Sequence, residues 1–160
     1  MTTAKLQHEL KKKRPFESPE EEAALSIVRT SDRLQICFAR LLREHDLTPS
    51  QYNILRILRG EGKPLPILEI ASRTITVVPG ITGLIDRLER AGFVHRLRCE
   101  KDRRIIYVAL TDQGTKTLAD LDEPLLALHR KLIGHLAQGD LKDLIRLLEK
   151  LRAPWTDSDE

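Results

Sequence analysis

The sequence predicts a mainly α-helical protein with one small β-hairpin. Apolar residues recur with a helical period over most of the chain, two segments carry the residues that begin helices, and two short β-branched segments flank a charged turn. With 160 residues, 41 % of them hydrophobic, the chain has the size and composition of a single domain with a buried core. Extensive disorder is therefore not expected.

Two helices in the N-terminal half begin at capping sequences. Ser18 precedes a proline, and a glutamate stands three positions after it, which is the capping-box arrangement. We expect a helix from there to about His45. Thr48 is followed by proline and, at the third position, by glutamine. This capping sequence predicts a second helix, which ends at Gly60 and Gly62.

Two shorter helices are predicted next. The segment LPILEIASR, residues 65–73, predicts about two helical turns. A fourth helix is expected over residues 79–91, because Pro79 is tolerated in a first turn and apolar residues then recur with helical spacing.

A hairpin and further helices follow. The segments FVHRLR and IIYVAL, on either side of a charged tip, predict a hairpin over residues 93–110. Thr111 begins a new helical segment, in which Pro124 is expected to kink or break the helix. The leucine-rich segments predict helices at residues 115–134 and 139–152.

Several classes of protein are not expected. The longest uncharged run, residues 74–85, contains a proline and two glycines and is too short to cross a bilayer. The first fifteen residues carry charges where a secretory signal has its apolar core. We therefore expect a cytoplasmic protein with reduced cysteines and no membrane contact.

Catalytic and metal-binding signals are also missing from the sequence. The five histidines form no i, i+4 pair, and no phosphate-binding glycine loop or catalytic triad spacing occurs. Neither an enzyme nor a cofactor is expected. Cys37 lies on an apolar stripe and is interpreted as a small hydrophobe, whereas Cys99 lies in the more accessible charged tip; the sequence leaves open whether either senses oxidants.

Positive charge is concentrated in two places. The formal net charge is only +3, but Lys11 to Arg14 form a basic cluster, and seven Lys or Arg residues lie between Arg87 and Arg104. Such clusters indicate either a polyanionic partner or a solvated surface. The N-terminal cluster is interpreted as either a phosphate-contacting arm or an untethered tail.

Four segments carry a family resemblance. In order, LTPSQYNILRIL, LEIASR, ITGLIDRLERAGFVHR and DRRIIYVALTDQG resemble the MarR family of bacterial winged helix-turn-helix transcriptional regulators, over about residues 20–152. The resemblance implies a homodimer, a pseudo-palindromic operator and, in many members, a small aromatic or phenolic effector. The expected regulator is a repressor or an activator, and repression is favoured.

The resemblance also implies an organisation. A single MarR-like domain is expected, with its recognition helix (79–91) in the major groove and its wing (93–110) at the minor groove. The expected parts are a flexible basic segment 1–17, a domain 18–152 made of dimerisation helices 18–46 and 112–152 around a winged-helix lobe 47–111, and an acidic tail 153–160.

The recognition helix departs from the family pattern. Where members usually carry Ser, Thr and Arg, this chain has Pro79, Gly80 and Gly83, which leaves Thr82 as the short polar side chain on that face. Either the glycines allow closer approach, with Pro79 and Thr82 touching thymine methyl groups, or specificity moves to DNA shape, which we favour. Alternatively, Gly83 permits close helix packing.

The wing then carries much of the expected specificity. By the resemblance, Arg104 matches the arginine that enters the minor groove, Asp102 the acidic residue that orients an arginine, and Arg103 either the phosphate contact or the salt bridge. Phosphate contacts are expected from Arg87, Arg96, Arg98 and the backbone amides after Thr48; alternatively, the three arginines form a solvated surface. The full predicted DNA-binding set is Thr48, Ser50, Thr76, Pro79, Gly80, Thr82, Gly83, Arg87, Arg96, Arg98, Arg103 and Arg104, with Asp102 orienting the wing.

A second function class stays open. A winged-helix dimer with weak or non-specific DNA binding, acting mainly through protein contacts, is favoured by the glycine-rich recognition helix alone. Preference for one DNA fragment over random DNA separates the two classes.

Overall fold

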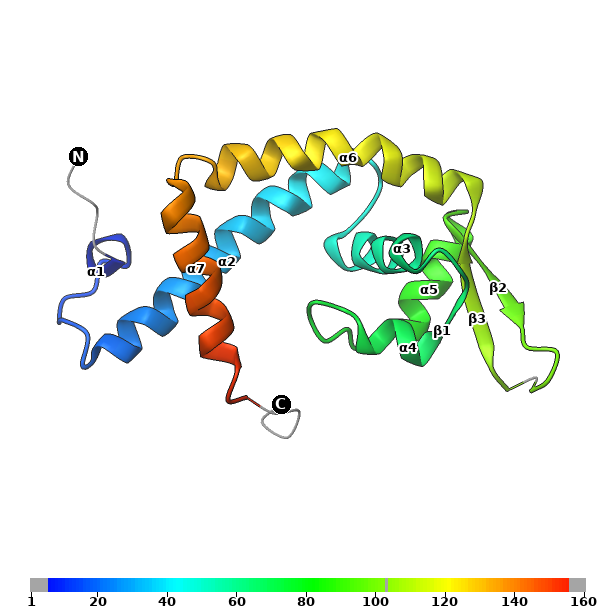
Figure 1. The fold of residues 1–160 in the computed structure, drawn as a ribbon, viewed down its shortest axis with the longest axis horizontal. Helices are drawn as coiled ribbons and strands as arrows, with labels where there is room; N and C mark the ends of the chain where they lie inside the picture. The colour runs from blue at the N-terminus through cyan, green and yellow to red at the C-terminus, as the bar shows by residue number, and fades with distance from the viewer. Residues whose placement is uncertain (1–5, 103, 156–160) are drawn as a thin grey trace. The chain divides into compact units, whose positions relative to one another are not determined.

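The computed structural model describes residues 6–102 and 104–155, and the chain divides into two compact units, Met1–Asp122 and Glu123–Glu160. The first unit holds most of the secondary structure, and α6 continues into the second (Figure 1). The elements are α1 (Leu6–Glu9), α2 (Pro19–Arg43), α3 (Pro49–Glu61), β1 (Leu65–Pro66), α4 (Ile67–Ser72), α5 (Ile81–Arg90), β2 (Val94–Arg98), β3 (Ile106–Leu110), α6 (Asp112–Ile133) and α7 (Gln138–Arg152). This mainly helical fold with a small antiparallel sheet confirms the predicted fold class.

The two predicted capping sequences begin α2 and α3. The Ser18 hydroxyl accepts a hydrogen bond from the Glu21 amide at 3.2 Å. At α3, the Thr48 hydroxyl accepts from the Gln51 amide at 3.3 Å, and the Gln51 side chain accepts from the Thr48 amide at 2.9 Å. Gly62 ends α3 in the left-handed conformation, with φ of 72°.

The sheet has one strand more than predicted. β2 and β3 form the expected hairpin, in register from Val94 opposite Leu110 to Arg98 opposite Ile106. Leu65 pairs with Val108 on the other edge of β3, so the sheet order is β1-β3-β2. The prediction of a helix over residues 65–73 is therefore wrong at its start. Leu65 precedes Pro66, which disfavours helical backbone, and its side chain is buried.

The recognition helix begins two residues later than expected. Gly80 is its N-cap, with φ of 68° and ψ of 40°, and Pro79 lies in the turn before it. A left-handed residue cannot continue a right-handed helix, so the predicted range 79–91 becomes Ile81–Arg90. The expected apolar stripe is confirmed, because Leu84, Ile85 and Leu88 are buried.

Pro124 does not end α6. The helix runs from Asp112 to Ile133 with this proline inside it. Of the two predicted outcomes, a kink or a break, the break is therefore wrong and the kink stays a prediction. The proline lacks the amide that would donate to the preceding turn. The boundary between the two compact units, after Asp122, falls within this turn.

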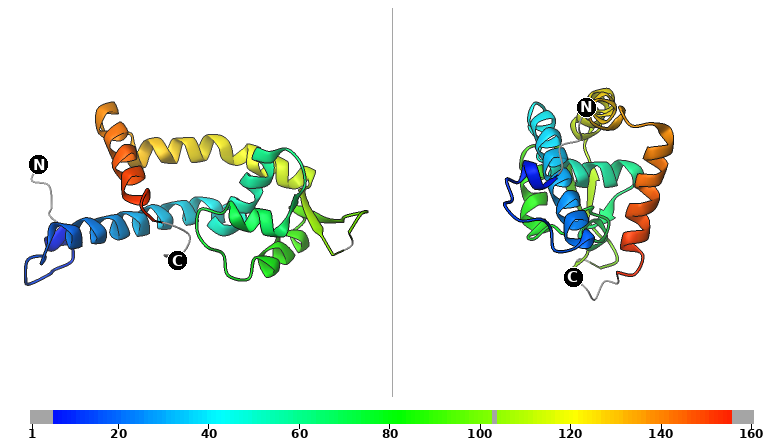
Figure 2. Two further views of the ribbon diagram at one scale, coloured as in Figure 1. Left: turned by 60° about the horizontal axis from the view of Figure 1, so that its bottom comes forward. Right: turned by 90° about the vertical axis from the view of Figure 1, so that its left-hand side faces the viewer.

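The core of the first unit positions the recognition helix and the wing. Helices α3, α4 and α5 lie together beside the sheet, and the β2–β3 hairpin extends beyond them in Figure 1 and in the left-hand view of Figure 2. Leucine and isoleucine side chains from α3 and α5 are buried together with Val108 of the sheet. No helix that the structure describes is long and apolar enough to cross a bilayer.

Candidate nucleic-acid interface

The outer face of α5 and its preceding turn is exposed. Thr76, Pro79, Gly80, Thr82 and Gly83 lie on this segment and are exposed or half-buried, while the opposite face of α5 is buried. The structure therefore brings these five predicted residues onto one continuous accessible segment. A helix whose inner face is anchored and whose outer face is free can enter a major groove.

Gly83 has open space around it. A Cβ atom built at this position meets no heavy atom within 4 Å in the described chain, and the same holds for Gly80. The close-packing interpretation of Gly83 is therefore wrong for contacts within this chain.

Two apolar side chains beside this face were not predicted as site residues. Ile75 is 80 % exposed and Val77 is 75 % exposed, in the connection between α4 and α5. The sequence signal was the uncharged run 74–85, in which Ile75 and Val77 alternate with threonines before Pro79. We call residues 74–79 the apolar loop.

Arg96 connects the base of the wing to α5. Its guanidinium donates to Asp86 at 2.6 Å and to Glu89 at 2.5 Å, and its backbone amide donates to Glu89 at 3.0 Å. Only 20 % of its side chain is exposed. Desolvation opposes the charge, but the hydrogen bonds and charges of Glu89 and Asp86 outweigh it, so the pKa of Arg96 is raised.

From this geometry we infer a positioning role for Arg96, and the phosphate contact expected from the sequence stays a prediction. Both carboxylates lie on α5 three residues apart, on one helix face, so they approach the same strand arginine. The same guanidinium also donates to the Thr82 carbonyl at 3.4 Å. Arg96 therefore fixes the angle between the recognition helix and the wing.

Arg104 has the opposite environment. Its side chain is 92 % exposed, and Asp102 accepts from its amide at 3.0 Å and from its Nε at 3.2 Å. The Ile105 amide donates to the Asp102 carbonyl at 3.0 Å, which closes the turn. The acidic side chain thus restrains both the backbone and the guanidinium of Arg104, which still faces solvent. Arg103, also predicted, lies outside the described residues.

The remaining predicted residues fall into two groups. Arg87 on α5 and Arg98 at the end of β2 are exposed cations near the recognition helix and the wing. At the start of α3, the Thr48 hydroxyl is engaged in the capping box and Ser50 is half-buried. Because the Thr48 hydroxyl is already engaged, the backbone amides at the start of α3 are better placed than this side chain to contact a phosphate.

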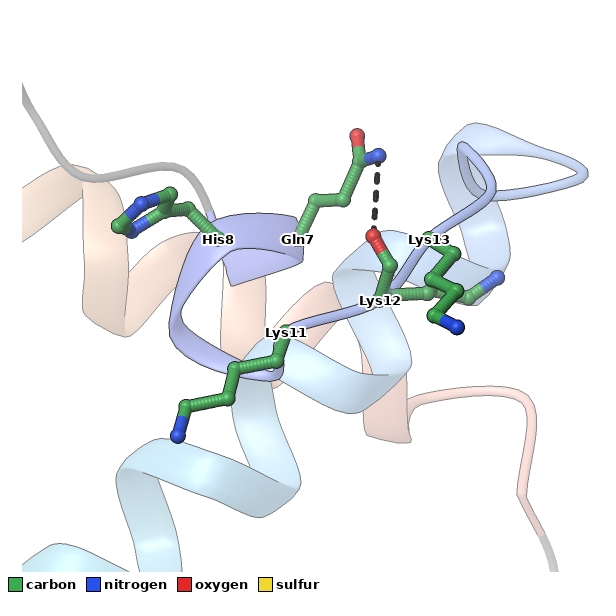
Figure 3. A pocket seen from close by; sticks show the side chains of 5 residues that line it. All are labelled: Gln7, His8, Lys11, Lys12 and Lys13. Atoms are coloured by element: carbon green, nitrogen blue, oxygen red, sulfur yellow. Dashed lines mark hydrogen bonds between the residues drawn. The ribbon is translucent and has the colours of Figure 1, made fainter.

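The N-terminal basic cluster contacts α2. Glu9 accepts from Arg33 at 3.4 Å, and Lys12 pairs with Glu21 at 3.4 Å while its ammonium lies 4.9 Å from the Phe16 ring centroid. The Lys12 contacts argue against an untethered tail, and the phosphate-contacting arm stays a prediction. A shallow hollow of about 560 Å³ is lined by Gln7, His8, Lys11, Lys12 and Lys13 (Figure 3).

Metal and thiol chemistry receive no support from side-chain placement. Within residues 6–102 and 104–155, no three His, Cys, Asp or Glu side chains lie close enough to hold a metal ion. Cys37 and Cys99 are both free thiols and both half-buried.

A helix-turn-helix with an exposed second helix, followed by a hairpin with a cationic tip, defines a winged-helix DNA-binding protein. The MarR family model matches residues 47–106. The uncharacterized HTH-type transcriptional regulator YkoM of Bacillus subtilis is 36 % identical over 109 residues, covering 68 % of this chain and 70 % of the relative.

Solved structures agree. A MarR transcription factor from Planctomyces limnophilus is 43 % identical, with a TM-score of 0.66, covering 84 % of this chain and 98 % of the other. The fold is also shared with a mutant MarR from E. coli complexed with operator DNA, with 24 % identity, a TM-score of 0.72 and coverage of 80 % and 91 %. The chain belongs to the MarR family and is a DNA-binding transcriptional regulator, not an enzyme.

Proposed function

We propose that this regulator is a cytoplasmic homodimeric repressor that binds a pseudo-palindromic operator, with α5 in the major groove and the wing at the minor groove. The observation that carries the proposal is that one lobe presents both an exposed α5 face and the wing arginine Arg104. Asp102 holds this arginine, and the Arg104 side chain is still 92 % exposed. One element offers a surface for base edges and the other offers a cation for the narrow groove.

The geometry of the lobe supports this assignment. α5 has 10 residues, about 15 Å of helix, which suits the width and depth of the major groove. The ion pairs of Arg96 with Asp86 and Glu89 fix the wing against this helix. The two DNA-contacting elements therefore keep a defined angle, which a sequence-specific reader requires.

Exposed apolar side chains support the homodimer. In α2, Val28 is 64 % exposed and Ile36 is 52 % exposed. In α7, Ile145 is 57 % exposed and Leu147 is 54 % exposed. Helical faces of this kind are normally covered in a stable protein, and a second copy of the chain is the partner that the family resemblance implies. Two-fold symmetry then predicts inverted half-sites about 10 bp apart, centre to centre.

The sign of regulation and the effector follow from the same proposal. A dimer bound over a promoter excludes the polymerase, which makes repression the simplest outcome. A small aromatic or phenolic effector releases the dimer if it binds the DNA-free conformation more tightly, because a ligand shifts an equilibrium only by its differential affinity.

Selection of bound fragments from random-sequence duplex DNA at physiological salt tests the proposal. We expect one enriched inverted repeat, bound at least about a thousandfold more tightly than scrambled duplex, with affinity that falls steeply as salt rises. Enrichment of no motif, with equal affinity for scrambled DNA, would contradict the proposal. That result would favour a winged-helix dimer that acts through protein contacts.

A further inference from the structure

The apolar loop is unusual for a surface connection. Its side chains Ile75 and Val77 are 80 % and 75 % exposed, in a segment without a charged residue from Thr74 to Ile85. Exposing large aliphatic side chains to water is unfavourable, and contact with another apolar surface relieves the cost. The loop is therefore a candidate contact surface.

The loop runs directly into the exposed face of α5. Pro79, Gly80, Thr82 and Gly83 continue the accessible segment, and Thr82 is the polar side chain among them. This surface offers methyl and methylene groups and few hydrogen-bond donors. Guanine, cytosine and adenine edges are recognised through donors and acceptors, whereas thymine alone among the four bases presents a methyl group in the major groove.

Gly83 allows this surface to approach closely. A Cβ atom at this position would meet open space in the chain, so the missing side chain leaves room for an outside partner. Arg87 lies four residues further on the same helix face and is exposed. On duplex DNA, the Arg87 guanidinium can pair with a backbone phosphate while the uncharged, methyl-bearing surface beside it faces thymine methyl groups in the major groove.

We propose that Ile75 and Val77 read thymine methyl groups in the major groove of each half-site, with Gly83 providing the room for close approach. This inference rests on the proposed operator binding and names its chemistry. It replaces shape readout, which the sequence favoured for the recognition helix, by methyl contact at the apolar loop, and leaves shape readout to the wing.

The test replaces deoxythymidine by deoxyuridine in the selected operator, which removes the methyl groups and keeps every hydrogen-bonding group. Removing one buried methyl contact weakens binding about fourfold. With several contacts per dimer, we expect the wild-type protein to bind the deoxyuridine operator at least about tenfold more weakly. A double variant, Ile75→Ala with Val77→Ala, should bind the thymine operator more weakly and lose less than about threefold on the exchange.

Leu68→Ala is the matched control. Leu68 is an aliphatic side chain of α4 that is 83 % exposed and lies outside the loop, so this variant should keep the full loss that the wild type shows. Thermal unfolding of each variant is the control for folding, and we expect cooperative transitions in all of them.

The outcomes separate this inference from the function on which it rests. Specific operator binding that is indifferent to the methyl groups, or an equal loss in the double variant and the wild type, would overturn the thymine assignment and leave operator binding standing. Equal wild-type affinity for the selected and scrambled duplexes would overturn both.

Discussion

The recognition helix and the wing of one lobe differ in how they meet solvent. The apolar loop and the first turn of α5 present aliphatic side chains and glycines, without a charged residue until Asp86. The wing is built around charge at both its base and its tip. In the functions proposed above, the apolar loop reads methyl groups and the wing reads the width and potential of the minor groove, so that the two elements divide recognition between them.

Within the wing, two arginines differ in how far they are exposed to solvent. Arg96 and Arg104 both pair with acidic residues, yet the side chain of the first is 20 % exposed and that of the second is 92 % exposed. The Arg96 guanidinium is occupied by contacts within the fold. The Arg104 guanidinium is restrained by Asp102 but remains accessible from solvent. Residue type alone does not distinguish a positioning arginine from a reading arginine.

The largest effect on folding is expected from Arg96→Ala. Removing this guanidinium leaves Asp86 and Glu89 without their shared partner, and we expect the free energy of unfolding to fall by about 1 to 2 kcal/mol. Arg104→Ala serves as the control and should change it by less than about 0.5 kcal/mol. Denaturant unfolding measures both variants, and equal stabilities would break the distinction between the two arginines.

A smaller effect of opposite sign is expected from Gly83→Ala. Alanine favours helix by about 0.8 to 1 kcal/mol over glycine and meets open space here, so stability should rise while operator affinity falls. Gly60→Ala is the matched control, because Gly60 lies in α3, is exposed and has equally open surroundings.

Urea unfolding and operator titration distinguish these two glycine variants. The control should gain stability and bind the operator like the wild type. Unchanged operator affinity in Gly83→Ala would show that the duplex does not approach this helix closely.

The smallest effect on stability is expected from Asp102→Asn. The ion pair with Arg104 is exposed and contributes little to folding, so the unfolding midpoint should remain unchanged. The amide restrains the guanidinium less well, and preference for the operator over scrambled DNA should fall by less than in Arg104→Ala. A competition titration with scrambled duplex measures this preference. A loss as large as in Arg104→Ala would show that Asp102 does more than orient this arginine.

Local sequence signals predicted much of the fold. Ser18 and Thr48 begin their helices as expected, because capping depends on residues only three positions away. β1 was missed because the extended backbone at Leu65 pairs with Val108, which lies far along the chain. Pro124 was expected to kink or break its helix, and the helix continues through it.

The candidate site was less predictable than the fold. Exposure of Arg104 beside Asp102 agrees with the arrangement that the family resemblance implies, since both residues lie in one turn. The role of Arg96 depends on two carboxylates of another element, and the surroundings of Gly83 and Ile75 depend on how the whole lobe packs. Sequence spacing identifies residues near the interface, and the fold decides which of them are free to bind.

The most direct test of this division is a comparison of Arg104→Ala and Arg96→Ala on the selected operator and on scrambled duplex at two salt concentrations. We predict that Arg104→Ala weakens operator binding by about 1 to 3 kcal/mol and lowers the operator-to-scrambled affinity ratio, because a reading contact is lost. Arg96→Ala should weaken operator binding less and lower this ratio by less than Arg104→Ala does, because it loosens the wing and removes no reading contact. Equal, sequence-independent losses in both variants, with the same change in salt dependence, would contradict the account.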